Sequence, residues 1–62
     1  MSAIDKEEWI RRAEVLGDAR DVLSTMRDEL TEPPPEALTN ANLLIGEVNS
    51  LVLACYAMAL RP

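Results

Sequence analysis

The chain has 62 residues, 11 of them acidic and 6 basic, which gives a net charge of −5. This length allows one domain at most, and a core too small to be stable without a disulfide, a metal or association. The acidic balance argues against a general nucleic-acid binder, which needs a basic patch, and against electrostatic docking on anionic membranes.

The first residues carry a signal for the start of a helix. Ser2 is followed three residues later by Asp5, the spacing of a capping box with Asp in place of the usual Glu. Asp5, Glu7 and Glu8 then place negative charge at the positive end of the helix dipole. A secretory signal would instead be basic and then apolar, so none is predicted.

Apolar residues recur every seven positions over residues 3–31 and predict an amphipathic helix. The two seams of this heptad are Trp9, Leu16, Leu23 and Leu30, and Arg12, Ala19 and Met26, so the apolar pattern is broken once, at Arg12. Residues 1–32 also hold nine acids and five bases, so this helix is expected to keep one solvated side.

Three successive prolines, Pro33 to Pro35, follow this helix. They remove three backbone donors and push the preceding residues toward extended geometry, so the first helix must end before them. A proline is tolerated in the first turn of a helix, and a second helix is therefore predicted from about residue 36. Residues 32–35 are predicted to be a stiff turn.

A second heptad over residues 36–60 predicts the second helix. Its seams are Ala41, Val48 and Cys55, and Leu44, Leu51 and Met58. Laid antiparallel so that paired residue numbers always add to 67, the two heptads bring at least one apolar residue into every layer. The predicted pairs are Trp9 with Met58, Leu16 with Leu51, Ala19 with Val48, Leu23 with Leu44, and Met26 with Ala41. The expected fold is an all-α antiparallel hairpin, a single domain of residues 1–62.

The second helix is apolar on all sides from Leu51 to Leu60, and one partner helix cannot cover it. A second stripe faces away from the predicted seam, and its small residues allow close approach of another helix. This predicted protein interface comprises Leu43, Gly46, Ser50, Leu53, Ala57 and Leu60, with Val52 and Tyr56 on its flank. The expected assembly is a homodimeric four-helix bundle with an isologous interface.

The remaining polar and reactive residues have simple structural interpretations. Glu47, the only charge inside the second helix, falls opposite Arg20, so a structural ion pair is favoured over an acid–base carboxylate. Cys55 lies on an apolar seam and is expected to be a buried, inert thiol. Asn49 has two possible roles, either fixing the register of the helices or lying in solvent, and the sequence favours neither. Asn40 and Asn42 are expected to be solvated.

The sequence therefore predicts a small, non-enzymatic helical interaction module without cofactor or metal. It would act as an adaptor, inhibitor or assembly factor by associating with itself or with an unidentified protein. The single cysteine favours a reducing cytoplasm. Two alternatives stay open. One is a dimeric RNA-binding hairpin that uses Arg11, Arg12, Arg20 and Arg27, and the other is membrane association through the second helix.

Overall fold

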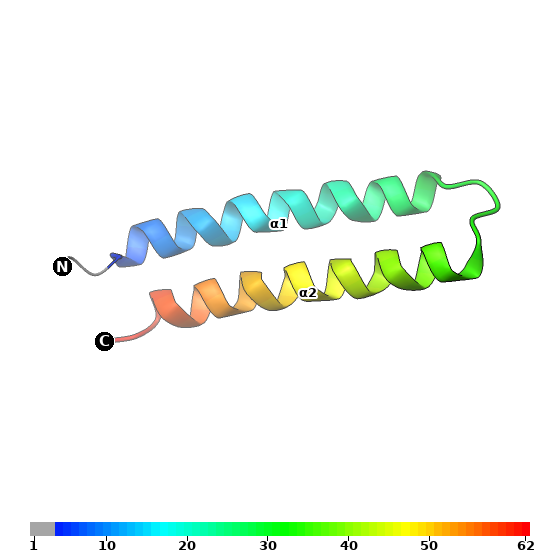
Figure 1. Ribbon diagram of the computed structural model, residues 1–62. Helices are drawn as coiled ribbons and strands as arrows, with labels where there is room; N and C mark the ends of the chain where they lie inside the picture. The colour runs from blue at the N-terminus through cyan, green and yellow to red at the C-terminus, as the bar shows by residue number, and fades with distance from the viewer. Residues whose placement is uncertain (1–3) are drawn as a thin grey trace.

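The computed structural model describes residues 4–62 and consists of two α-helices joined by a short connection. Helix α1 spans Lys6–Glu29 and helix α2 spans Pro35–Ala59. They run antiparallel and side by side, so that both termini lie at one end (Figure 1). No strand occurs in residues 4–62. The prediction of an all-helical hairpin is confirmed.

Asp5 determines where α1 begins. Its side chain accepts a hydrogen bond of 2.8 Å from the backbone N–H of Glu8, and Asp5 itself is extended, with φ −78° and ψ 169°. The helix thus starts at Lys6, later than the predicted residue 3. Ser2, the predicted capping residue, lies outside the described residues. The capping spacing predicted for Ser2 and Asp5 is found one turn further along, at Asp5 and Glu8.

The connection between the helices is short and contains one unusual backbone conformation. Leu30 leaves α1 in an extended conformation, and Glu32 has a positive φ of 49°. Pro35 occupies the first position of α2, where its missing N–H costs little. The carbonyl of Pro34 then accepts bonds from the N–H groups of Ala37 and Leu38. The connection turns the chain back on itself within a few residues.

A small cluster of buried side chains holds the helices together. Ala13 of α1 is 1% exposed, and Val52, Cys55 and Ala59 of α2 are 5%, 7% and 4% exposed. Trp9 and Leu16 pack against this cluster and are half-buried. The least exposed residues along α1 continue this line at intervals of three and four, and we call them the α1 contact line: Trp9, Ala13, Leu16, Arg20, Leu23 and Arg27. The corresponding α2 contact line is Ala41, Ile45, Val48, Val52, Cys55 and Ala59.

The predicted pairing with a sum of 67 needs correction, because both helices are rotated relative to it. Leu44, Leu51 and Met26, three predicted seam residues, are 48%, 54% and 58% exposed. Their neighbours Ile45, Val52 and Arg27 occupy the contact lines instead. The small side chains of Ala13, Cys55 and Ala59 lie between the helices, and side chains at the contact set how closely two helices approach. Because of this rotation, Met26, Leu44 and Leu51 lie beside the helix contact instead of within it.

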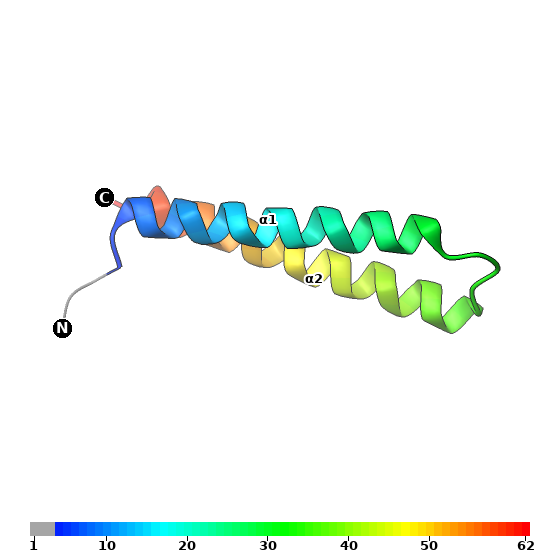
Figure 2. The same ribbon diagram turned by 90° about the horizontal axis from the view of Figure 1, so that it is seen from above.

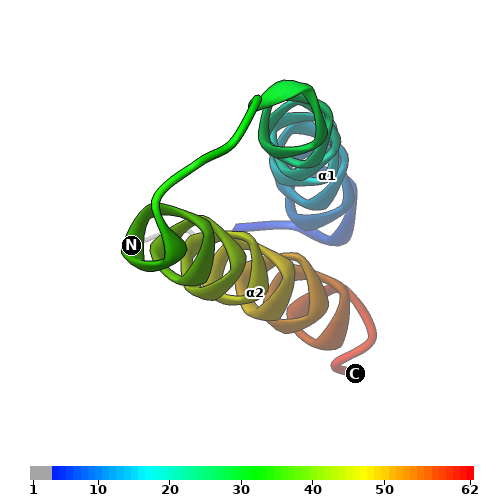
Figure 3. The same cartoon turned by 90° about the vertical axis from the view of Figure 1, so that its right-hand side faces the viewer.

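The hairpin is long and thin. Its principal extents are 48 × 18 × 15 Å and its radius of gyration is 14.6 Å, whereas a compact domain of this length has a radius of gyration of about 11 Å. The two helices cross at a shallow angle and diverge toward the connection (Figure 2). Seen along its length, the part of the chain that the structure describes is α1 beside α2, and neither helix has a further element against its outer side (Figure 3). Each helix therefore keeps most of its circumference in solvent.

Candidate association surfaces

Two hydrogen bonds between side chains of the two helices fix their register. Arg20 Nη1 donates to Asn49 Oδ1 at 2.7 Å, and Arg27 Nη1 donates to Asn42 Oδ1 at 2.9 Å. Asn49 therefore joins the helices, and Asn42 does too, although it was predicted to be solvated. The side chains of Arg20 and Arg27 are 32% and 28% exposed, so both are largely covered where they reach across to α2.

The predicted Arg20–Glu47 ion pair is not formed. Arg20 instead contacts the carboxylate of Asp21 at 3.2 Å in addition to Asn49. Glu47 is exposed, and no salt bridge to it is found within residues 4–62. The rotation of α2 that brings Asn49 opposite Arg20 turns Glu47 away, which explains the difference.

The apolar stripe predicted on α2 is exposed in the hairpin, and we call it the outer stripe. It comprises Leu43, Gly46, Ser50, Leu53, Ala57 and Leu60. Space around Gly46 is open, because a Cβ built there meets nothing within 4 Å. The hydroxyl of Ser50 donates to the Gly46 carbonyl at 3.1 Å, which hides its polarity. Tyr56 on the flank is 42% exposed, but Val52 is buried against α1 and does not belong to the stripe.

The structure contains a second apolar surface that the sequence pattern did not indicate. We call it the two-helix face, and it comprises Val15, Val22 and Met26 of α1, Leu30 directly after α1, and Leu44 and Leu51 of α2, all of them 48–58% exposed. At the connection end, Met26, Leu30 and Leu44 line one groove together with Leu23, Ala41 and Ile45. Further along, Val15 lines a second groove with Trp9, Arg11, Arg12, Leu16 and Cys55. This face thus extends across both helices.

The opposite side of the hairpin is acidic on α1. Glu14, Asp18 and Asp21 line a groove with Gly17, Val52 and Tyr56, and Asp28 continues this acidic row two turns later. Arg20 and Arg27 each contact one of these carboxylates, Asp21 and Asp28. The two broad sides of the hairpin therefore differ. One side carries the two-helix face, and the other carries the acidic row of α1 beside Val52 and Tyr56 of α2.

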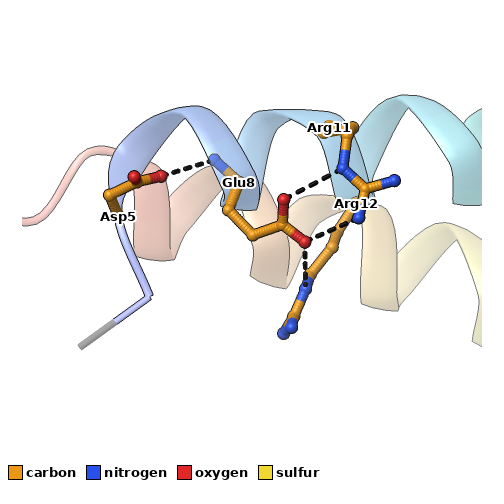
Figure 4. Close-up of polar contacts among 4 residues, drawn as sticks. All are labelled: Asp5, Glu8, Arg11 and Arg12. Atoms are coloured by element: carbon orange, nitrogen blue, oxygen red, sulfur yellow. Dashed lines mark hydrogen bonds and ion pairs between the residues drawn. The ribbon is translucent and has the colours of Figure 1, made fainter. Parts of the chain in front are cut away.

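A cluster of charged residues lies at the open end, where α1 begins (Figure 4). The Glu8 carboxylate accepts from Arg11 Nη2 at 2.6 Å and from Arg12 Nε at 3.3 Å. The hydrogen bond from Arg11 is the main reason why the pKa of Glu8 is lowered to about 2. Arg12 also lies over the Trp9 ring, 5.0 Å from its centroid, a cation–π contact. Trp9 is held at the open end partly by this contact.

All four arginines of the predicted basic strip contact a carboxylate. Arg11 and Arg12 contact Glu8, while Arg20 contacts Asp21 and Arg27 contacts Asp28. Arg20 and Arg27 are also engaged between the helices, which leaves fewer free donors for phosphates. Within residues 4–62, no group of three or more Cys, Asp or Glu side chains could hold a metal ion. Cys55 is buried, as predicted, between the helices.

Helix α2 is also long and apolar enough to cross a membrane by length and composition. Its most apolar 18-residue window has a mean hydropathy of 1.4, and only 11% of that window is buried within the hairpin. The core helix of a soluble protein has the same length and composition. The apolarity of α2 therefore shows that this helix is uncovered in the hairpin, and it does not distinguish a lipid from a protein as its cover.

Comparison with protein-family models, with curated protein sequences and with solved structures gives no match for this chain.

Proposed function

We propose that this chain is a non-enzymatic interaction module that works by associating with a second copy of itself, forming a homodimeric four-helix bundle. Such a module acts as an adaptor, inhibitor or assembly factor, and its single cysteine suits the reducing cytoplasm. The proposal includes association of the completed dimer with another protein. It assigns no catalytic residue, cofactor or metal.

One observation carries this proposal, the surface that the hairpin leaves uncovered. The chain exposes 4932 Å² for a mass of 6.9 kDa, whereas a compact folded monomer of this mass exposes about 4,000 Å². The excess of about 900 Å² is close to the ~800 Å² that each partner contributes to a standard protein interface. A single interface would therefore give the chain the surface of an ordinary folded protein.

The first prediction follows by mass action. Because folding and association are linked, the thermal midpoint of the purified chain should rise with protein concentration, and sedimentation equilibrium should show a dimer at micromolar concentration. Circular dichroism at several concentrations measures the midpoint. A well-folded monomer whose midpoint does not depend on concentration would contradict the proposal.

A membrane-associated role is the second candidate, and the apolarity of α2 favours it. Lipid tails would then cover the surface that a second copy covers in the first proposal. Polar residues within α2 oppose this role, because Asn42, Glu47 and Asn49 would enter the hydrocarbon. Flotation of the purified chain with neutral lipid vesicles distinguishes the two: an oligomer that stays at the bottom of the gradient supports the first, and co-flotation supports the second.

A further inference from the structure

We infer that the second copy packs on the two-helix face and not on the outer stripe, with the two faces of a dimer related by a twofold axis. This inference rests on the proposed self-association and assigns it to residues. The outer stripe of α2, the surface indicated by the sequence pattern, then lies on the outside of the dimer.

The positions of the heptads relative to the helix contact carry the inference. In a four-helix bundle each helix touches two neighbours and points its core residues between them. The heptad of α1 includes Leu16 and Leu23, which lie on the contact line, and Met26, which lies on the two-helix face. Met26 directly precedes Arg27 of the contact line, and successive residues are about 100° apart around a helix. The α1 heptad thus points between α2 and the two-helix face.

Helix α2 shows the same displacement. Leu44 and Leu51 of its heptad directly precede Ile45 and Val52 of the contact line. Leu44 lies on the same side of the hairpin as Met26, because both line one groove. Leu51 follows Leu44 by seven residues, two helical turns, and therefore shares that side of α2. Both heptads therefore point toward one axis beside the hairpin. A second hairpin placed face to face completes a bundle around that axis.

The charge distribution supports the same choice. The six residues of the two-helix face are uncharged, and Arg11 and Arg12, which line one groove with Val15, both contact the carboxylate of Glu8. Two copies can therefore meet there without bringing unpaired like charges together. The opposite side carries Glu14, Asp18, Asp21 and Asp28 along α1. Two copies of a chain with net charge −5 would repel each other if these acids faced one another. A second copy is thus the natural occupant of the two-helix face.

A matched pair of substitutions on one helix tests the assignment in the full-length chain. Leu51 belongs to the two-helix face and Leu53 to the outer stripe, and their exposed fractions are 54% and 61%. Leu51→Glu and Leu53→Glu are each combined with Glu47→Gln, because Leu51→Glu alone would place a like charge four residues after Glu47. The two variants then add the same charge two residues apart, and their effects on helix propensity and net charge are the same. In a twofold dimer each substitution occurs twice at the interface.

The dissociation constant of each variant is measured by sedimentation equilibrium or by dilution calorimetry. Leu51→Glu should weaken dimerisation by at least about tenfold, as removal of a central contact does, whereas Leu53→Glu should change it by less than about threefold. Weakening by Leu53→Glu alone, by both equally, or by neither overturns the assignment. If the wild-type chain is itself a folded monomer, the proposed function fails instead.

A second measurement does not depend on whether the variants fold. Isotope-filtered NMR on a mixture of labelled and unlabelled wild-type chains detects contacts between copies only. Methyl contacts between copies are expected at Val22, Met26 and Leu51. Contacts between copies at Leu53 and Leu60 in their place would show that the outer stripe is the dimer interface.

Discussion

At the scale of single residues, Asp5 and Glu8 organise the first turn of α1. The Asp5 carboxylate accepts a hydrogen bond from the backbone N–H of Glu8, which satisfies one of the free donors at the helix start. Glu8 in turn accepts from the side chains of Arg11 and Arg12. The chain of contacts places acids toward the N-terminus and bases one turn later, the order that the helix dipole favours.

The pKa of Glu8 gives a prediction at this scale. Its value of about 2 lies below the ordinary value of 4.5, so the stabilisation from its charged form is complete above pH 4.5 and is lost as the pH falls toward 2. A carbon-detected NMR titration of the Glu8 carboxyl measures the value directly. Arg11→Gln should raise this pKa more than Arg12→Gln, because the hydrogen bond from Arg11 is the largest cause. The reverse order would contradict the geometry of Figure 4.

At the scale of elements, the two helices have different compositions. Helix α1 buries only Ala13 and surrounds an apolar side with acids and bases. Helix α2 buries Val52, Cys55 and Ala59 and still exposes leucines on two further sides, such as Leu51 and Leu53. A helix of this kind needs cover on more sides than α1 provides. The surface that covers α2, whether a second copy on one of its two exposed sides or lipid, is therefore what distinguishes the proposed modes of association.

Gly46 provides the prediction for α2. A side chain at this position enters open space in the hairpin, and leucine is the better helix former, so Gly46→Leu should stabilise the chain by up to ~1 kcal/mol and leave the dimer intact. Close packing of another helix on the outer stripe gives the opposite sign, because overpacking costs about 1–3 kcal/mol. Urea unfolding and sedimentation equilibrium measure the two quantities. Gly17→Leu on α1 is the control, where a Cβ meets Arg20 Nη2 at an ordinary 3.7 Å.

At the scale of the whole molecule, the connection and the inter-helix bonds define the hairpin, while little of its surface is buried. The buried cluster has only Ala13, Val52 and Cys55 at its centre. Arg20 with Asn49 and Arg27 with Asn42 add directional contacts along the rest of the length. The hairpin alone therefore has a very small core, and in the proposed four-helix bundle it forms one of two layers.

The prolines of the connection give the prediction for the whole hairpin. Replacing Pro33, Pro34 and Pro35 by glycine increases the freedom of the unfolded chain, so the free energy of unfolding should fall, with about 0.4–1 kcal/mol expected for each residue. Helical content should change little, because Pro35 only begins α2. Chemical denaturation followed by circular dichroism measures both. Pro62→Gly, outside the helices, is the control. A more stable variant with a new oligomer size would show that the prolines prevent one continuous helix.

The sequence by itself determined the helices, the turn and the antiparallel arrangement. These features depend on local rules: a period of seven, three prolines that cannot continue a helix, and a connection too short for any other arrangement. Among the large heptad residues, Trp9, Leu16 and Leu23 lie on the α1 contact line, whereas Met26, Leu44 and Leu51 are exposed. The heptads could not reveal how far each helix is rotated about its axis, because Leu44 and Ile45 or Leu51 and Val52 are equally apolar neighbours.

Only the tertiary structure decided that rotation. The small side chains of Ala13, Cys55 and Ala59 lie between the helices, and Arg20 and Arg27 reach Asn49 and Asn42 across the contact, so one pairing is preferred over its neighbours. The pairing turned Glu47 away from Arg20 and buried Val52, which the sequence had placed at an outer surface. It also gathered the displaced heptad residues into the two-helix face. The physical reason is that a period along one helix fixes which residues share a side, whereas the direction of that side depends on close packing with a neighbour.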